Sequence, residues 1–123
     1  MYGEGMIVIG QGSYLGSLST IQSVEGQKVE IGMKCSISHN VRIYTMNREP
    51  NQDMSKDEIE TRKGDVRIGD YCWIGVNVFI REGVTIGDNC VIGANSVVTS
   101  DMPSHTVCGG VPAKILYVKD YAR

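Results

Sequence analysis

An aliphatic residue recurs every six positions in the stretch Ile68-Gly-Asp-Tyr-Cys-Trp-Ile74-Gly-Val-Asn-Val-Phe-Ile80. Twelve positions of the chain share this phase: Ile9, Leu15, Ile21, Ile31, Ile37, Ile43, Ile68, Ile74, Ile80, Ile86, Ile92 and Val98. A helix face recurs at three and four residues, so a period of six excludes an amphipathic helix. It fits a short strand and a turn, three of which close one triangular coil. The pattern predicts a parallel β-helix of about four coils, with the aliphatic residues inside.

In nine of the twelve hexapeptides a small or modest residue fills a second slot, four positions after the aliphatic one. Cys35, Cys72 and Cys90 all occupy this slot in the first hexapeptide of their coils. We expect them to form one column of small buried residues. Cys72 and Cys90 are one coil apart, so their Cα atoms are expected near 5 Å, within reach of a disulfide. We nevertheless predict that they stay reduced, as in a reducing cytosol.

The bulk properties limit the class of protein. The chain has 123 residues, a formal net charge of −2 and no stripe of Lys or Arg, which indicates one domain and no nucleic-acid partner. Its apolar runs are too short for a bilayer span, and its first residues lack the pattern of a signal peptide. We therefore expect no membrane insertion and a cytoplasmic location. Two histidines and no Cys-x-x-Cys pair predict no metal site.

Two insertions interrupt the repeat. Residues 25–28 form a small bulge at a corner, and a long polar segment from about 46 to 65 has no periodicity. A loop of this length in a regular solenoid is usually functional or disordered. The expected layout is a single domain over residues 1–123, with coils over about 7–103, the inserted loop over about 46–65 and a short C-terminal tail over 104–123.

Specific segments accompany the repeat in the second half: Trp73-Ile-Gly75, Asp101-Met-Pro103 and Gly110-Val-Pro-Ala-Lys114. With the repeat, they resemble the galactoside/maltose O-acetyltransferase branch of the hexapeptide acyltransferases, over about Ile9 to Tyr117. The resemblance implies an all-β, left-handed β-helix, although general crossover rules would favour the right hand. It also implies a homotrimer with active sites between subunits. The implied reaction is direct acetyl transfer from acetyl-CoA to a hydroxyl of a sugar or glycan precursor.

The same resemblance assigns residues to the CoA site. Trp73 would form a wall at the thioester end, and Lys114 would lie near the phosphates. The residues that would face CoA are Val76, Ala94, Thr99, Ser100 and Lys114.

The chain departs from the family pattern where that pattern has a catalytic histidine in the long loop, because Arg48 stands there. A guanidinium stays protonated and cannot be a general base, although it could bind an anionic acceptor or brace an oxyanion. His39 is the substitute to test, because it is the third residue of its hexapeptide, the same slot as Val76 and Ala94. The alternative is an exposed turn histidine; His105 lies beyond the last coil.

Two other functions stay open. Transfer to the amine of an amino sugar needs less help from a base than transfer to a hydroxyl. A non-catalytic, CoA-binding trimer would also explain the replacement by Arg48. The sequence does not identify the acceptor.

Overall fold

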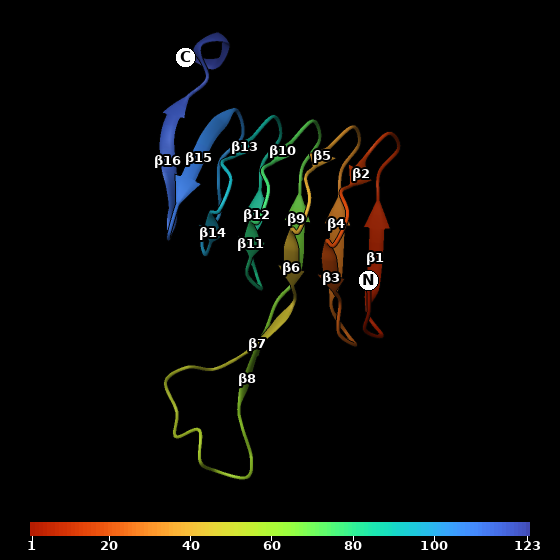
Figure 1. The fold of residues 1–123 in the computed structure, drawn as a ribbon, viewed down its shortest axis with the longest axis vertical. Coiled ribbons are helices and arrows are strands. Elements are labelled where there is room, and N and C mark those ends of the chain that lie inside the picture. Colours follow the sequence, from red (N-terminus) through yellow and green to blue (C-terminus); the bar gives the residue numbers. More distant parts are fainter.

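The chain folds as a left-handed parallel β-helix of triangular cross-section, and the computed structural model describes residues 1–123. Three sheets form the sides of the prism, and all their strands pair in parallel except β16 (Figure 1). The first contains β1 (Met6–Ile9), β4 (Lys28–Ile31), β9 (Val66–Ile68) and β12 (Thr85–Ile86). The second contains β2 (Tyr14–Leu15), β5 (Ser36–Ile37), β10 (Trp73–Ile74), β13 (Val91–Ile92), β15 (Thr106–Gly110) and β16 (Ala113–Val118). The third contains β3 (Thr20–Gln22), β6 (Arg42–Tyr44), β11 (Phe79–Ile80) and β14 (Val97–Val98).

The core consists of the residues that the six-residue period selects. From Ile21 to Val98, every aliphatic residue in phase has an exposed fraction of 1% or less. Ile9 and Leu15 are only partly buried, because the first coil has a neighbour on one side only. Cys35, Cys72 and Cys90 are buried in the second slot, as predicted. The predicted architecture is therefore confirmed.

Turn geometry explains why asparagine recurs at the corners. In nine of the twelve hexapeptides the residue three positions after the aliphatic one adopts a positive φ, as in Asn40 (56°), Asn77 (60°) and Asn95 (63°). Asparagine tolerates this conformation better than most residues. The three side chains also form a ladder, in which Asn40 donates to Asn77 (2.7 Å) and Asn77 donates to Asn95 (3.1 Å).

The first part of the predicted C-terminal tail, β15 (Thr106–Gly110), continues the second sheet, so the solenoid extends beyond the expected end of the coils at about residue 103. Met102 bridges to Ile86, and Cys108 pairs with Ile92 in β15. Both side chains are buried, so they begin a fifth, incomplete rung. The chain then reverses, and β16 runs antiparallel to β15 before a short 3-10 helix, η1 (Asp120–Ala122). None of the helical structure is long and apolar enough to cross a membrane.

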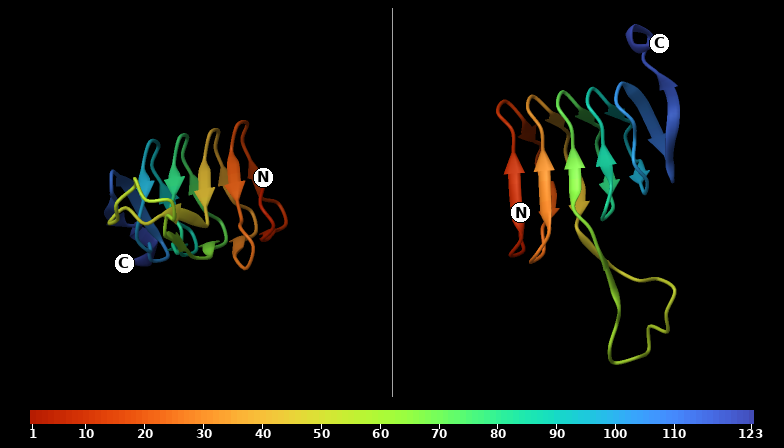
Figure 2. Two further views of the ribbon diagram at one scale, coloured as in Figure 1. Left: turned by 90° about the horizontal axis from the view of Figure 1, so that it is seen from below. Right: turned by 180° about the vertical axis from the view of Figure 1, so that it is seen from behind.

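Both insertions lie at the same corner of the prism, between the third sheet and the first. A turn in which Gln27 N–H donates to the Val24 carbonyl (3.0 Å) forms the small bulge. The long insertion is more ordered than the sequence indicated, because its two ends pair as an antiparallel hairpin of β7 (Met46–Arg48) and β8 (Thr61–Lys63). This hairpin projects well beyond the prism (Figures 1 and 2).

Candidate functional site

A pocket of about 380 Å³ lies on the second sheet and the corner that follows it. Three residues predicted from the sequence, Trp73, Val76 and Ala94, meet there. The complete lining is Ser38, Trp73, Gly75, Val76, Val91, Ile92, Gly93 and Ala94. A pocket of this size and largely apolar character suits one end of a small organic ligand.

The repeat itself positions these side chains. Trp73 and Val91 are in register on β10 and β13 and point outward, while Ile74 and Ile92 point into the core. The floor of the pocket needs glycine at position 75, because an added Cβ would lie 2.7 Å from the Ala94 nitrogen. Four residues of the lining were not predicted from the sequence: Ser38, Gly75, Val91 and Gly93. They occupy slots of the repeat next to the slots of the predicted residues.

A larger depression of about 620 Å³ lies at the corner with the two insertions. Its lining is Glu4, Gly5, Met6, Gly26, Gln27, Lys28 and Asp65, of which only Met6 is apolar. It is shallow, open and contains none of the predicted site residues. We therefore regard the smaller pocket beside Trp73 as the candidate site.

His39 lies one rung below Val76 in the same slot but does not line the pocket. Its Nδ1 accepts a hydrogen bond from the backbone N–H of Ser17 at 2.7 Å. A neutral imidazole whose Nδ1 accepts in this way carries its proton on Nε2. In this arrangement His39 therefore offers a hydrogen-bond donor at Nε2 and no free lone pair.

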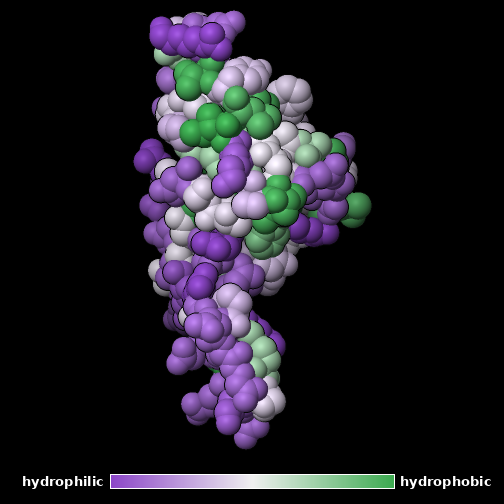
Figure 3. Space-filling view, turned by 90° about the vertical axis from the view of Figure 1, so that its left-hand side faces the viewer, coloured by the Kyte–Doolittle hydropathy of each residue, from purple (hydrophilic) through white to green (hydrophobic).

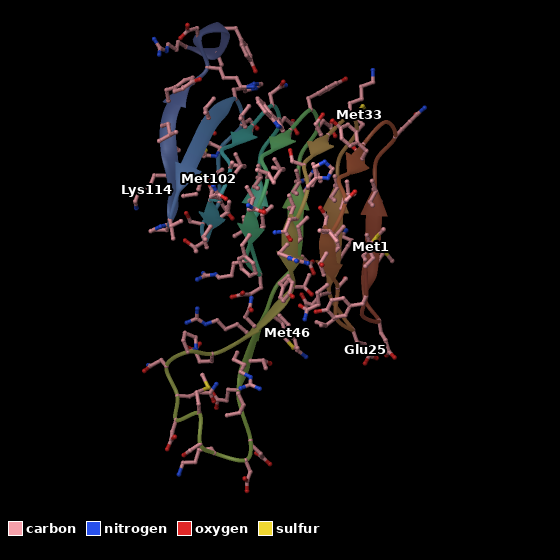
Figure 4. The ribbon with its side chains drawn as sticks, in the orientation of Figure 1. Met1, Glu25, Met33, Met46, Met102 and Lys114 are labelled. Carbon is pink, nitrogen blue, oxygen red and sulfur yellow. The ribbon has the colours of Figure 1, made fainter.

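The other predicted CoA-facing residues lie apart from this pocket within one chain. Thr99 and Ser100 follow β14 at the next corner, and Lys114 is exposed on β16, opposite Gly109. Figure 4 shows Lys114 pointing outward at the C-terminal end of the prism. A single subunit therefore brings together Trp73, Val76 and Ala94, but not the other residues that the resemblance assigns to CoA.

Arg48 is exposed on β7 and takes part in no ion pair. The carboxylates nearest to it in the sequence are unsuited to accept a proton. A hydrogen bond from the Arg62 side chain lowers the pKa of Glu49, and one from the Ser55 hydroxyl lowers the pKa of Asp53. His105 is engaged elsewhere, with its Nδ1 2.9 Å from the Tyr121 hydroxyl. No group of three metal-ligating side chains occurs in the chain.

Known proteins share both the repeat and this fold. Residues 65–100 match the family described as bacterial transferase hexapeptide (six repeats). The galactoside O-acetyltransferase of Escherichia coli K12 is 37% identical over 125 residues, which cover 94% of this chain and 60% of that protein. A maltose O-acetyltransferase from Clostridium difficile 630 superposes with a TM-score of 0.70 at 32% identity, over 97% of this chain and 69% of that one.

A galactoside acetyltransferase solved in complex with coenzyme A is also similar. Its TM-score is 0.74 at 27% identity, over 95% of this chain and 66% of that chain. The chain thus spans 60% of the length of the curated galactoside O-acetyltransferase. The shared part is the β-helix that carries the pocket beside Trp73.

Proposed function

Because the chain belongs to the hexapeptide-repeat family of bacterial transferases, we propose that it transfers an acetyl group from acetyl-CoA to a hydroxyl of a sugar or glycan precursor. The observation that carries the proposal is the pocket in which Trp73, Val76 and Ala94 converge. Galactoside and maltose acetyltransferases that share this fold support the class of acceptor, and the coenzyme A complex supports the donor. A cytoplasmic location is part of the same proposal, since the donor is acetyl-CoA.

We place the acetyl and pantetheine end of the donor in this pocket. Trp73 would cover the thioester, and Val76 and Ala94 would contact the arm. Lys114 on β16 would interact with the phosphates, for which an ammonium group is a suitable partner. Thr99 and Ser100 would contact CoA bound by a neighbouring subunit's pocket, because they lie at another corner of the same chain.

The proposed reaction is a direct displacement. The acceptor oxygen attacks the thioester carbonyl, the carbon–sulfur bond breaks, and the sulfur leaves with the electron pair. The acceptor's proton must pass to a base and finally to the CoA sulfur. We assign proton acceptance to Nδ1 of His39, which requires that the ring first release the Ser17 N–H. Arg48 and the ion-paired Glu49 are unsuited to this step.

A homotrimer completes the proposal, since the pocket is open on one side and a neighbour would supply the second wall. The C-terminal end of the prism offers apolar surface for association (Figure 3). On β16 alone, Ile115, Leu116, Tyr117 and Val118 are between 41% and 64% exposed. Exposed apolar surface of this kind commonly marks an interface.

Acetylation of an amine is the second candidate, and one observation favours it. The His39 Nδ1 atom is occupied and Arg48 replaces the loop histidine, so no base stands free at the site. A neutral amine attacks a thioester without prior deprotonation. Release of CoA thiol, measured with a panel of sugar alcohols and amino sugars, separates the two reactions. Release with hydroxyl acceptors supports the first; release only with amines supports the second. If no acceptor releases thiol although CoA binds, the protein is a non-catalytic binder.

A further inference from the structure

The hairpin β7–β8 divides its side chains between two faces. Directly opposed residues on an antiparallel ladder point to the same side, and successive residues alternate. Asn47 opposes Arg62 on one face, while Arg48 opposes Thr61 and Met46 opposes Lys63 on the other. One face therefore carries Asn47 and Arg62, and the opposite face carries Arg48 and Lys63.

The charges on the Asn47 face are satisfied within the protein. The Arg62 guanidinium binds Glu49, with Nη2 donating to Oε1 at 3.0 Å. Asn47 donates from Nδ2 to Oε1 of Glu82 at 2.7 Å. Glu82 is 7% exposed and also pairs with Arg81, so it holds the base of the hairpin against the prism. The only strand cation of this face, Arg62, is therefore paired and not free for an anionic ligand.

The opposite face carries two cations without a carboxylate partner. Neither Arg48 nor Lys63 takes part in any of the four ion pairs of the chain, and both side chains are exposed. They occupy diagonal positions of the ladder, whose Cα atoms lie about 7–8 Å apart. Side chains of this length can reach one anionic group placed between them.

The position of these cations is fixed by the root of the hairpin. Gly64 N–H donates to the Thr45 carbonyl at 3.0 Å, and Met46 N–H donates to the Gln22 side chain at 3.2 Å. Thr45 itself is buried and donates from its hydroxyl to the Gln22 carbonyl at 3.0 Å. Figure 4 shows Met46 at this root, where the hairpin leaves the prism. The two cations are thus held next to the hydrogen-bonded root of the hairpin and away from its tip.

We propose that Arg48 and Lys63 bind an anionic group, a carboxylate or a phosphate, on the sugar acceptor. This inference rests on the proposed function and on the proposed trimer. The hairpin leaves the prism at a different corner from the pocket of its own chain. By the resemblance, position 48 would therefore reach the acceptor at an active site shared with a neighbouring subunit. A guanidinium forms two parallel hydrogen bonds with either anion, and an ammonium group adds a second positive charge. At position 48 the chain then has a cation that selects anionic acceptors, where the family pattern has a general base.

Steady-state acetyl transfer tests the proposal with three acceptors of one sugar type: neutral, carboxylated and phosphorylated. Arg48→Gln and Lys63→Gln should each raise the KM of the anionic acceptor about tenfold, the scale of one charged hydrogen bond. The KM values of the neutral acceptor and of acetyl-CoA should not change. Lys56→Gln is the matched control, because it removes the same charge from the exposed tip of the same hairpin. If both variants lose affinity for the carboxylated sugar, the bound group is a carboxylate; if they lose affinity for the phosphorylated sugar, it is a phosphate.

Calorimetric titration of the same anionic sugars into the wild-type protein separates this inference from the proposed function. If no acceptor is acetylated but an anionic sugar binds, and Arg48→Gln weakens that binding, the inference stands while the acetyl-transfer proposal fails. If neutral sugars are acetylated and anionic ones neither react nor bind, the inference fails while the proposed function stands. An equal effect of Lys56→Gln would also overturn it, since the attraction would then come from general charge.

Discussion

The backbone N–H of Ser17 donates a hydrogen bond to Nδ1 of His39 across the boundary between the first and second coils, at 2.7 Å. This contact holds the only histidine near the candidate pocket in the tautomer that presents a donor at Nε2. A base at this place must release Ser17 before it can accept a proton. Transfer to a hydroxyl through His39 therefore requires that its hydrogen bond with Ser17, a residue outside the pocket, is broken first.

Replacement of His39 tests its role as the base. We expect His39→Ala to lower turnover with hydroxyl acceptors about 10²-fold, the usual scale for the loss of a general base. CoA affinity should change little, because His39 does not line the pocket. Single-turnover kinetics and CoA titration measure the two effects separately. Unchanged turnover would remove His39 from the mechanism.

Removal of the Ser17 N–H should release the histidine. Ser17 precedes Leu18, whose φ is 65°, so it occupies the turn position that accepts proline readily. We expect Ser17→Pro to raise turnover up to about tenfold, the upper range for one hydrogen bond. Ser17→Ala keeps the N–H and serves as the control. If the proline variant folds and gains nothing, the contact does not limit the reaction.

Arg48→His restores the family residue on β7. We expect it to raise turnover with neutral hydroxyl acceptors and to weaken the use of anionic ones, since it exchanges a fixed cation for a base. Comparison of kcat and KM for both acceptor classes checks this exchange. Failure of both Arg48→His and His39→Ala to change hydroxyl transfer would favour amine acetylation or a non-catalytic role.

Sedimentation tests the proposed assembly. We expect a stable homotrimer at micromolar concentration, because the pocket beside Trp73 is open and β16 exposes apolar side chains. A stable monomer in that range would contradict the trimer. It would also weaken the acyl-transfer proposal, because Thr99 and Ser100 could not reach a neighbour's pocket.

A core residue in an inner coil should contribute more to the free energy of unfolding than one in the first coil. Ile74 is fully buried between two neighbouring coils, so Ile74→Ala should lower the free energy of unfolding by about 2–5 kcal/mol. The same change at Ile9, which is partly buried in the first coil, should cost less. Urea denaturation at one protein concentration compares the two variants. Equal losses would contradict the assignment of Ile9 to a coil with only one neighbour.

Much of the fold could be predicted from the sequence, because each coil buries aliphatic residues at the same six-residue interval. The fifth rung escaped prediction for two reasons. It starts at Met102, two residues out of phase with Val98, and it uses Cys108 where earlier coils have isoleucine. The hairpin was missed because β7 and β8 pair across a long polar segment without alternating apolar residues.

The site was predictable only where it follows the repeat. The resemblance singled out Trp73, Val76 and Ala94 as site residues. The period explains why they converge, because Val76 and Ala94 occupy the same slot in stacked coils and Trp73 lies on the strand before Val76. The contact between Ser17 and His39 depends on a side-chain rotamer, which no spacing specifies. The neutralisation of Arg62 and the freedom of Arg48 depend in turn on the strand register of the hairpin.

The reversal of the chain after β15 has a consequence for self-association. A parallel β-helix that ended on β13 would present unpaired backbone groups with the same direction as its own strands, and such an edge invites end-to-end growth into fibres. Here the parallel strand β15 covers β13, and β16 covers β15 and runs the opposite way. An incoming β-helix would meet a strand of the wrong polarity for continuing the stack. We infer that this reversal disfavours end-to-end stacking through the second sheet, whereas the first and third sheets end on the parallel strands β12 and β14.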